Sequence, residues 1–146
     1  MGHMEGLRRL CIDTDVLIDY LRGPSAVTKL LMKKIHEERI QVCTTAVNSF
    51  EIWLGVSMAS NPEALTITTE RFMSQLEIIG LNYETSVEAG RILANLRKEG
   101  QTLEIRVVFV GSIAKLNDIS LVTRNTRHYQ RIHELSIMIP EEALRN

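Results

Sequence analysis

Carboxylate and amide side chains follow three of the strands that the sequence predicts. Asp13 comes directly after the apolar run 10–12, Glu51 lies in the helix expected after a second strand, and Asn125 follows a late strand. Ligands of open α/β sheets bind outside the carboxyl ends of the strands, so these side chains meet in one pocket if the strands are neighbours. Their oxygens are hard ligands that suit Mg²⁺ or Mn²⁺. Such a cation lowers the pKa of bound water and stabilises charge on a phosphodiester.

Asp13 carries the strongest argument for a function among these residues. A carboxylate at the end of a buried strand costs free energy unless it has a partner. Glu51 stands among apolar residues of a predicted helix, and Asn125 is equally typical of a turn. The argument for a functional role of either residue therefore depends mainly on its expected position near Asp13. Asp15 is more typical of a helix N-cap than of a metal ligand.

Strands and helices alternate along the chain, and this alternation predicts the scaffold that positions the pocket. Apolar runs predict strands at 10–12, 40–44, 78–81, 119–123 and 136–139. Helical periodicity and capping residues predict helices over 16–22, from Ser25 to about 35, from Thr45 or Ser49 through Leu54, and over 63–76, 85–98 and 107–116. The pattern favours an α/β domain, a three-layer α/β/α sandwich with a central, mostly parallel sheet.

Length and composition are those of an ordinary globular domain. The chain has 146 residues, 45% of them hydrophobic, and a formal net charge of −1, which is enough chain for one core and excludes intrinsic disorder. No apolar run approaches the roughly 18–20 residues of a membrane span, so we expect a cytoplasmic protein with no membrane partner. The 17 basic residues are offset by 18 acidic ones, so any contact with nucleic acid must be local. We interpret residues 1–3 as an expression remnant and 4–146 as a single domain.

The two cysteines, Cys11 and Cys43, stand inside apolar runs. Burial statistics favour reduced, buried thiols in such a setting. A disulfide or a metal pair is the alternative, although the sequence has neither a C-x-x-C motif nor a Cys/His metal spacing.

The most basic stretch of the chain surrounds Asn125. It contains Arg124, Arg127 and Arg131, together with Tyr129. A solvated face is the default interpretation of such a run. Beside the predicted pocket, however, Arg124 and Arg127 would suit RNA binding, and Tyr129 would suit stacking on a base.

Three short motifs, taken in order, resemble those of PIN domains. They are CIDTDVLI at 11–18, Thr45 with SFE at 49–51, and LVTRN at 121–125 followed by His-Tyr at 128–129. More narrowly, they are similar to the VapC-type toxins of toxin–antitoxin modules, and the resemblance runs from about residue 10 to 140. It implies a parallel α/β/α domain, a Mg²⁺- or Mn²⁺-dependent endoribonuclease acting on RNA, a homodimer, and inhibition by a VapB-type antitoxin.

The resemblance also implies roles for individual residues. Asp13 resembles the first acidic metal ligand of the family and Glu51 the second, while Asn125 stands where a fourth polar or acidic group belongs. These three are therefore the predicted catalytic residues. Thr14 and Thr123 are expected to support them, Thr123 by hydrogen bonding.

The third acidic position is where this sequence departs from the family pattern. Counting back from the motif at 122–125, the expected Asp falls at Val107, and valine can neither bind a cation nor orient water. Glu104, three residues upstream, is the nearest carboxylate that would supply a substitute. We expect that Val107 replaces Asp in an otherwise active nuclease, through a single-base change selected against toxicity, by design, or in a naturally degenerate copy. Loss of one ligand typically costs a metal site 10–100-fold or more in affinity or activity.

Two other function classes remain open. A catalytically inactive module that binds RNA or antitoxin is consistent with Val107. A phosphatase or phosphotransferase that uses Asp13 as nucleophile is suggested by the Asp13-x-Asp15 spacing after a strand. That chemistry also needs a lysine and a later acidic pair, and Arg124-Asn125 follows the late strand instead.

Overall fold

The computed structural model describes residues 8–146, which form one five-stranded sheet and eight helices. The strands are β1 (Arg9–Ile12), β2 (Gln41–Thr45), β3 (Glu77–Ile79), β4 (Ser120–Val122) and β5 (Ile137–Met138). They are arranged in the order β3-β2-β1-β4-β5, and every neighbouring pair is parallel. The predicted fold class is confirmed, with a sheet that is parallel throughout.

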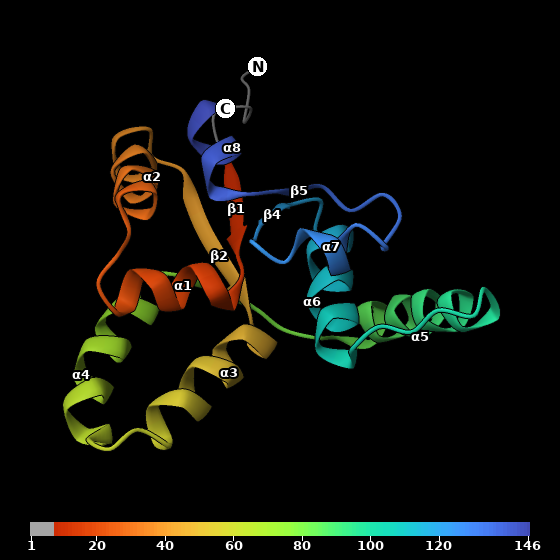
Figure 1. The fold of residues 1–146 in the computed structure, drawn as a ribbon, viewed down its shortest axis with the longest axis horizontal. Coiled ribbons are helices and arrows are strands. Elements are labelled where there is room, and N and C mark those ends of the chain that lie inside the picture. The colour runs from red at the N-terminus through yellow and green to blue at the C-terminus, as the bar shows by residue number, and fades with distance from the viewer. Residues whose placement is uncertain (1–7) are drawn as a thin grey trace.

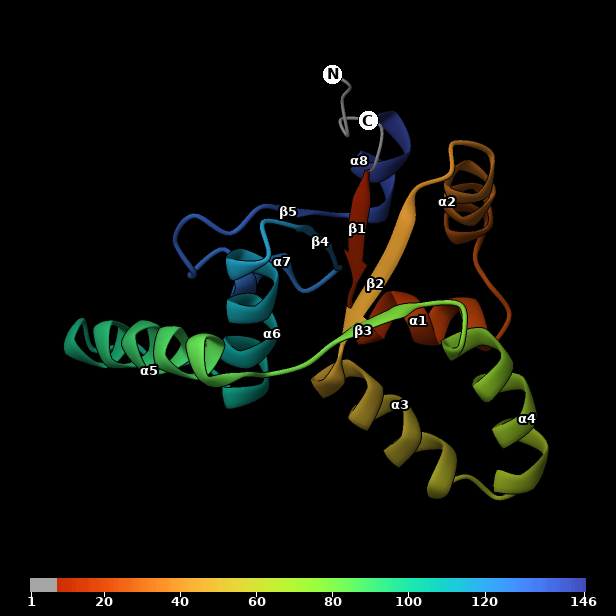
Figure 2. The ribbon, with the colours of Figure 1, turned by 180° about the vertical axis from the view of Figure 1, so that it is seen from behind.

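The helices cover both faces of the sheet. They are α1 (Thr14–Leu21), α2 (Ala26–Glu37), α3 (Ala46–Ser57), α4 (Pro62–Met73), α5 (Tyr83–Lys98), α6 (Ile105–Leu116), α7 (Thr126–Tyr129) and α8 (Pro140–Arg145). Figures 1 and 2 show α5 and α6 on one side of the sheet and α1, α2 and α4 on the other. The short helices α7 and α8 were not predicted from the sequence.

The alternation of side chains along β1 divides the core into two layers. Successive residues of a strand point to opposite faces. Cys11 accordingly packs in the cluster that includes Val107 and Tyr129, while Ile12 packs in the cluster that includes Leu17. Both neighbours in β1 are fully buried, as expected for a central strand of a parallel sheet.

The register of the sheet aligns the carboxyl ends of its three central strands. Cys11 of β1 lies opposite Cys43 of β2 and Leu121 of β4. The backbone N–H of Asp13 continues this pairing by donating to the carbonyl of Val122, at 2.9 Å. The residues that follow β1, β2 and β4 therefore lie at one edge of the sheet.

Helix boundaries largely follow the predicted caps, with one correction. Ser25 caps α2, as predicted, and Thr45 caps α3, which decides between the predicted starts at Thr45 and Ser49. The N-cap of α1 is Asp13, not Asp15: the Asp13 carboxylate accepts a hydrogen bond from the Thr14 N–H, and Asp15 lies in the first turn. The strand simply ends one residue before the helix begins, which leaves no separate capping residue between them.

The remaining sequence predictions about the chain have mixed outcomes. Cys11 and Cys43 are free and fully buried, as predicted. Among residues 8–146, none of the helices combines the length and hydropathy of a membrane span. The expression remnant predicted at residues 1–3 lies outside the described residues.

Candidate functional site

Asp13 is the most deeply buried carboxylate at the carboxyl edge of the sheet. It is 2% exposed and accepts four hydrogen bonds. Its Oδ1 accepts from the Thr14 N–H (2.9 Å) and from the Asn48 amide (2.8 Å). The Tyr129 hydroxyl also donates to Oδ1 (3.3 Å), and the Thr123 hydroxyl donates to Oδ2 (2.7 Å). These donors offset the cost of removing the carboxylate from water.

Asn48 links the start of α3 to Asp13. Its Oδ1 accepts from the Thr45 N–H and hydroxyl, at 3.2 and 2.7 Å, and this contact forms a capping box at the N-terminus of the helix. Its Nδ2 donates to Asp13 and to the Thr14 hydroxyl oxygen, both at 2.8 Å. One buried amide therefore both caps α3 and orients the first carboxylate.

Glu51 lies one turn further along α3 and is joined to Asp13 through two residues. The Thr14 hydroxyl donates to Glu51 Oε1 at 2.6 Å. Arg106 of α6 donates from Nε to Oε2 at 2.5 Å and from Nη2 to Oε1 at 2.9 Å. The same Nη2 is 3.5 Å from Asp13 Oδ1. We call the group formed by Asp13, Glu51 and Arg106 the acidic pocket.

The charge states of the pocket follow from burial and from these contacts. Partial burial by itself lowers the pKa of Arg106, but the hydrogen bond to Glu51 and the nearby Asp13 charge outweigh it, and the pKa is above its ordinary value. Burial and the Asp13 charge raise the pKa of Tyr129 far above its usual range. Arg106 therefore stays positively charged, and Tyr129 stays a hydrogen-bond donor.

Val107 is buried in the core beside the acidic pocket, packed in the same cluster as Tyr129, whose hydroxyl donates to Asp13. Val107 is 2% exposed, and its backbone N–H donates to the Glu104 carbonyl at 3.0 Å. Glu104, at the N-cap of α6, is exposed, and within residues 8–146 no hydrogen bond or ion pair joins its side chain to Asp13 or Glu51. Asp15 also lies near Asp13. Burial and the Asp13 charge raise the pKa of Asp15, but its Oδ2 accepts from the Arg124 N–H. Among the described residues, no third carboxylate therefore completes a ligand group with Asp13 and Glu51.

Asn125 reaches Asp13 only indirectly. Its backbone N–H donates to the Thr123 hydroxyl oxygen at 2.9 Å, and that hydroxyl donates to Asp13. The Asn125 amide oxygen is 2.6 Å from His128 Nδ1. Thr123 is thus in direct contact with the carboxylate, as predicted for a supporting residue, while the Asn125 side chain is turned toward α7.

The predicted RNA-binding residues differ in their surroundings. Arg124 is exposed, its backbone N–H donates to Asp15 at 3.0 Å, and its guanidinium forms a two-point pair with Glu141, at 3.0 and 3.2 Å. Arg127 is exposed on α7. Tyr129 is fully buried, so the expectation that it stacks on a base is wrong. Its hydroxyl is used by Asp13 instead.

The donor set of the pocket does not fit a divalent cation as it stands. Across residues 8–146, no group of three or more His, Cys, Asp and Glu side chains is arranged to hold a metal. The two carboxylates that would act as ligands share the Arg106 guanidinium, and Val107 offers no oxygen. Every buried side-chain nitrogen and oxygen in the described part of the chain already has a hydrogen-bond partner.

Three residues of this site, Asn48, Arg106 and Tyr129, were not predicted from the sequence to contact Asp13 or Glu51, and Tyr129 was expected to stack on a base instead. Asn48 had a usable signal, because it follows Thr45 at capping-box spacing and precedes Glu51 by three residues, on the same side of a helix. Arg106 had a weaker one: it is the single charge in the apolar run 105–114. The contact between Tyr129 and Asp13 spans 116 positions and has no local signal.

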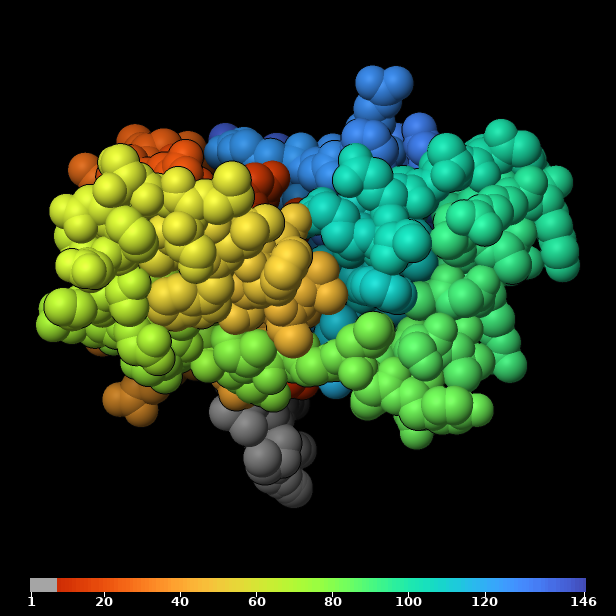
Figure 3. All heavy atoms as spheres, turned by 90° about the horizontal axis from the view of Figure 1, so that it is seen from below, coloured from red at the N-terminus to blue at the C-terminus, as the bar shows by residue number. Residues whose placement is uncertain are grey.

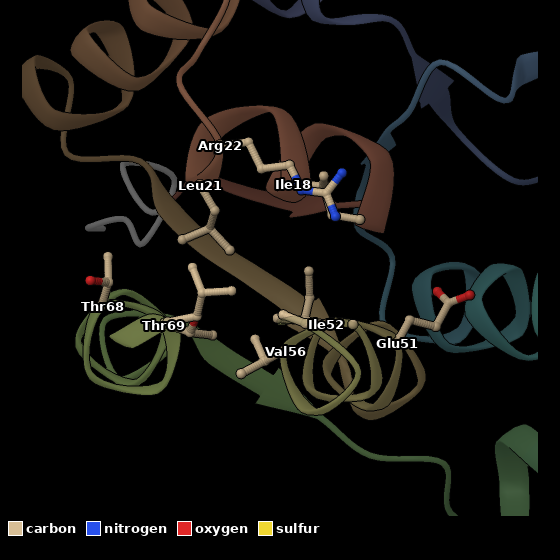
Figure 4. Close-up of a pocket in the computed structure, with 11 residues that line it drawn as sticks. Ile18, Leu21, Arg22, Glu51, Ile52, Val56, Thr68 and Thr69 are labelled. Carbon is tan, nitrogen blue, oxygen red and sulfur yellow. The ribbon is translucent and has the colours of Figure 1, made fainter. Parts of the chain in front are cut away.

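Two depressions border the acidic pocket. A cavity of about 110 Å³ lies between α1, α3 and α4, and Figure 4 shows Glu51 at its edge, beyond the apolar side chains of Ile18, Ile52 and Val56. An apolar groove runs between α3 and α6 and is lined by Phe50, Ile105 and Phe109 as well as by Glu51 and Arg106. Figure 3 shows this face, where α3 in yellow approaches α6 in teal.

A known protein family matches most of this chain. The family model of the PIN domain matches residues 10–134, which is most of the chain. The chain belongs to the PIN-domain family. The PIN match includes Asp13, Glu51, Val107 and Asn125, so the whole acidic pocket lies within the matched region.

Individual PIN-domain relatives are distant in sequence. Ribonuclease VapC1 of Methanocaldococcus jannaschii is 25% identical over 131 residues, which cover 90% of this chain and 86% of the relative. The tRNA(fMet)-specific endonuclease VapC of Shigella flexneri is 20% identical over 124 residues, covering 85% of this chain and 92% of the relative.

Solved structures support the PIN fold independently. In the DNA-bound VapBC structure from Salmonella typhimurium, one chain aligns with a TM-score of 0.82 and 20% identity, over 92% of this chain and 98% of that one. A chain of the VapBC2 structure from Rickettsia felis, bound to promoter DNA, aligns with a TM-score of 0.81 and 18% identity, over 90% and 98%. At this identity the likeness establishes the fold alone.

Proposed function

We propose that this PIN domain is a VapC-like endoribonuclease toxin whose cleavage of RNA is strongly reduced in the chain as written. The observation that carries the proposal is the meeting of Asp13 and Glu51 at the carboxyl edge of the sheet, with Val107 in place of the third acid. Relatives named as ribonucleases support the reaction class.

The roles proposed for the other residues follow from their contacts. Asp13, Glu51 and Asn125 are the proposed catalytic residues. Thr14 supports the two carboxylates, since it donates to both, and Thr123 supports Asp13. The proposed RNA contacts are Arg124 and Arg127, which are exposed on the segment that follows β4.

Mg²⁺ or Mn²⁺ is the proposed cofactor for a chain with an acid at position 107. Three carboxylates would then converge, and carboxylate oxygens are the ligands these ions prefer. The chain as written keeps two of the three. The residue at position 107 therefore determines both whether the proposed cofactor binds and whether the chain is active.

The proposed partners are a VapB-type antitoxin and a second copy of the chain. Solved structures of VapBC complexes that share the fold support the first. The exposed face of α3 and its C-cap offers apolar area for a partner, because Phe50, Leu54 and the C-cap residue Met58 are 64%, 47% and 77% exposed. Large apolar side chains grouped in this way are typical of interaction surfaces.

Restoring the acid tests the proposal directly. Purified wild type, Val107→Asp, and the double variant Asp13→Asn/Val107→Asp are incubated with RNA and either Mg²⁺ or Mn²⁺. We expect Val107→Asp to cleave at least about tenfold faster than wild type, since a single missing ligand typically costs 10–100-fold. The double variant should lose this gain. A folded Val107→Asp variant that cleaves no faster than wild type would contradict the proposal.

A non-catalytic module that binds RNA or antitoxin is the second candidate. Arg106 favours it, because this side chain already neutralises the pocket. In that case RNA binding is retained while cleavage stays absent in wild type and in Val107→Asp alike. The phosphotransferase alternative is less favoured, since Asp13 is 2% exposed and both of its oxygens already accept hydrogen bonds.

A further inference from the structure

The Arg106 guanidinium spans the two carboxylates of the acidic pocket. It forms a two-point pair with Glu51, and its Nη2 is also 3.5 Å from Asp13 Oδ1. Two-point arginine–carboxylate pairs are among the stronger and more directional ion pairs in proteins. The positive charge that the carboxylates need is therefore supplied by the chain itself.

We propose that Arg106 is an internal counter-cation of the acidic pocket, and that a divalent ion reaches Asp13 and Glu51 only when this side chain moves away. The inference concerns the pocket of the proposed function and rests on it for its biological meaning. It makes no assumption about RNA cleavage, and it is tested without RNA.

The carboxylate oxygens have little capacity left for a metal. Glu51 Oε1 accepts from Thr14 and Arg106, and Oε2 accepts from Arg106. Asp13 Oδ1 accepts three further hydrogen bonds besides facing Arg106. A divalent cation needs oxygen lone pairs that are free of donors. It would therefore have to displace the guanidinium from Glu51 before it could bind.

The position of Arg106 on α6 explains why the arginine faces the pocket. Successive residues of an α-helix are turned by about 100° from one another. Val107 is buried in the core cluster that contains Tyr129, and Arg106, one residue earlier, reaches both carboxylates. With valine at 107, this end of α6 presents only a positive charge to Asp13 and Glu51. The Arg106 side chain is already 28% exposed, so it can move out of the pocket into solvent.

The size of the effect follows from competition for the same oxygens. When a site is open in only a fraction of molecules, the apparent dissociation constant rises by the inverse of that fraction. If the guanidinium is in place in about nine molecules of ten, its removal tightens binding of a divalent ion about tenfold.

Mn²⁺ binding to the full chain tests the inference. Binding of Mn²⁺ alone is measured by electron paramagnetic resonance of the free ion, for wild type, Arg106→Met and Arg9→Met. Arg9 pairs with Glu77 at the opposite end of β1, so Arg9→Met is a matched control that removes the same charge and an arginine–glutamate pair. We expect Arg106→Met to bind Mn²⁺ about tenfold more tightly than either of the others, and Glu51→Gln/Arg106→Met to lose the gain.

Equal Mn²⁺ affinity of Arg106→Met and Arg9→Met would overturn the inference. A second variant covers the case in which Arg106→Met does not fold. Arg106→Gln also removes the positive charge but keeps a hydrogen-bond donor, and Arg9→Gln is its matched control. We expect Arg106→Gln to bind Mn²⁺ more tightly than Arg9→Gln, and equal affinities would contradict the proposal. A negative result in these Mn²⁺-binding measurements leaves the Val107→Asp cleavage test unaffected. A negative cleavage result likewise leaves the Mn²⁺-binding measurements unaffected.

Discussion

Replacement of Asp13 should separate the charge of this residue from its hydrogen bonds. Asp13→Ala removes the acceptor of the Thr14 N–H, the Asn48 amide, and the Thr123 and Tyr129 hydroxyls. Asp13→Asn keeps a carbonyl oxygen for the three donors that now meet at Oδ1. Its new amide group faces Thr123, whose hydroxyl already accepts from Asn125 and can turn to accept a second hydrogen bond.

The two variants therefore differ in expected stability. An unpaired buried donor costs about 1–3 kcal/mol, but Asn48 keeps its bond to Thr14, and water can enter the space that Ala leaves. We expect Asp13→Ala to lower the free energy of unfolding by about 3–5 kcal/mol. Asp13→Asn loses mainly the attraction to Arg106, which keeps Glu51, and should cost about 1 kcal/mol.

Urea unfolding followed by the fluorescence of Trp53, the single tryptophan, measures both values. The midpoint should shift with little change in the denaturant slope. For a chain of this size, each kcal/mol corresponds to about 2–4 °C in melting temperature, so the two variants should be clearly resolved. Tyr129→Phe, which removes only the longest of the four bonds, is the control and should cost less than Asp13→Ala. If Asp13→Asn is as destabilising as Asp13→Ala, charge rather than hydrogen bonding holds the site together, and the reasoning is refuted.

The remaining predictions concern Arg124 and Asn48. Glu141→Gln should release Arg124 and tighten RNA binding about two- to threefold in a filter-binding assay, with no gain if Arg124 is also changed to Ala. The hydrogen bond from Arg124 lowers the pKa of Glu141, so this pair contributes to stability above the ordinary glutamate pKa, and the contribution is lost as pH falls through the lowered value. Acidification should therefore release Arg124 and strengthen RNA binding in wild type, but not in Glu141→Gln. Asn48→Ala should cost about 2–4 kcal/mol in urea unfolding, more than the roughly 1 kcal/mol expected for the exposed cap change Ser25→Ala, and equal costs would argue against the role of Asn48 at Asp13.

The fold was largely predictable because its signals are local. Short apolar runs between helical segments indicate a parallel α/β sheet, and the residues after β1, β2 and β4 could be placed at one edge without coordinates. The wrong cap of α1 also has a local cause. Asp13 and Asp15 are both good capping residues, and only the exact end of β1 decides between them.

Only part of the site was predictable, because its hydrogen bonds and ion pairs join residues that are far apart in the sequence. Asp13 and Glu51 were identified from their positions after strands. Arg106 had no comparable rule, since the family resemblance draws attention to position 107, where it implies an acid. The contacts of Arg106 with both carboxylates depend on how α6 packs against α3 and β1, and the sequence does not specify that packing.

The order of strands in the sheet has a consequence for how the protein is made. Of the five strands described, β1 is the first to leave the ribosome, yet it lies at the centre of the sheet between β2 and β4. Its second edge stays unpaired until residues 120–122 have been synthesised, and the Thr123 and Tyr129 hydroxyls that complete Asp13 arrive later still. Contacts so distant in sequence slow folding, and an unpaired edge invites association with other chains. The acidic pocket therefore does not exist on the nascent chain, and a truncated product of this gene would carry Asp13 without its site.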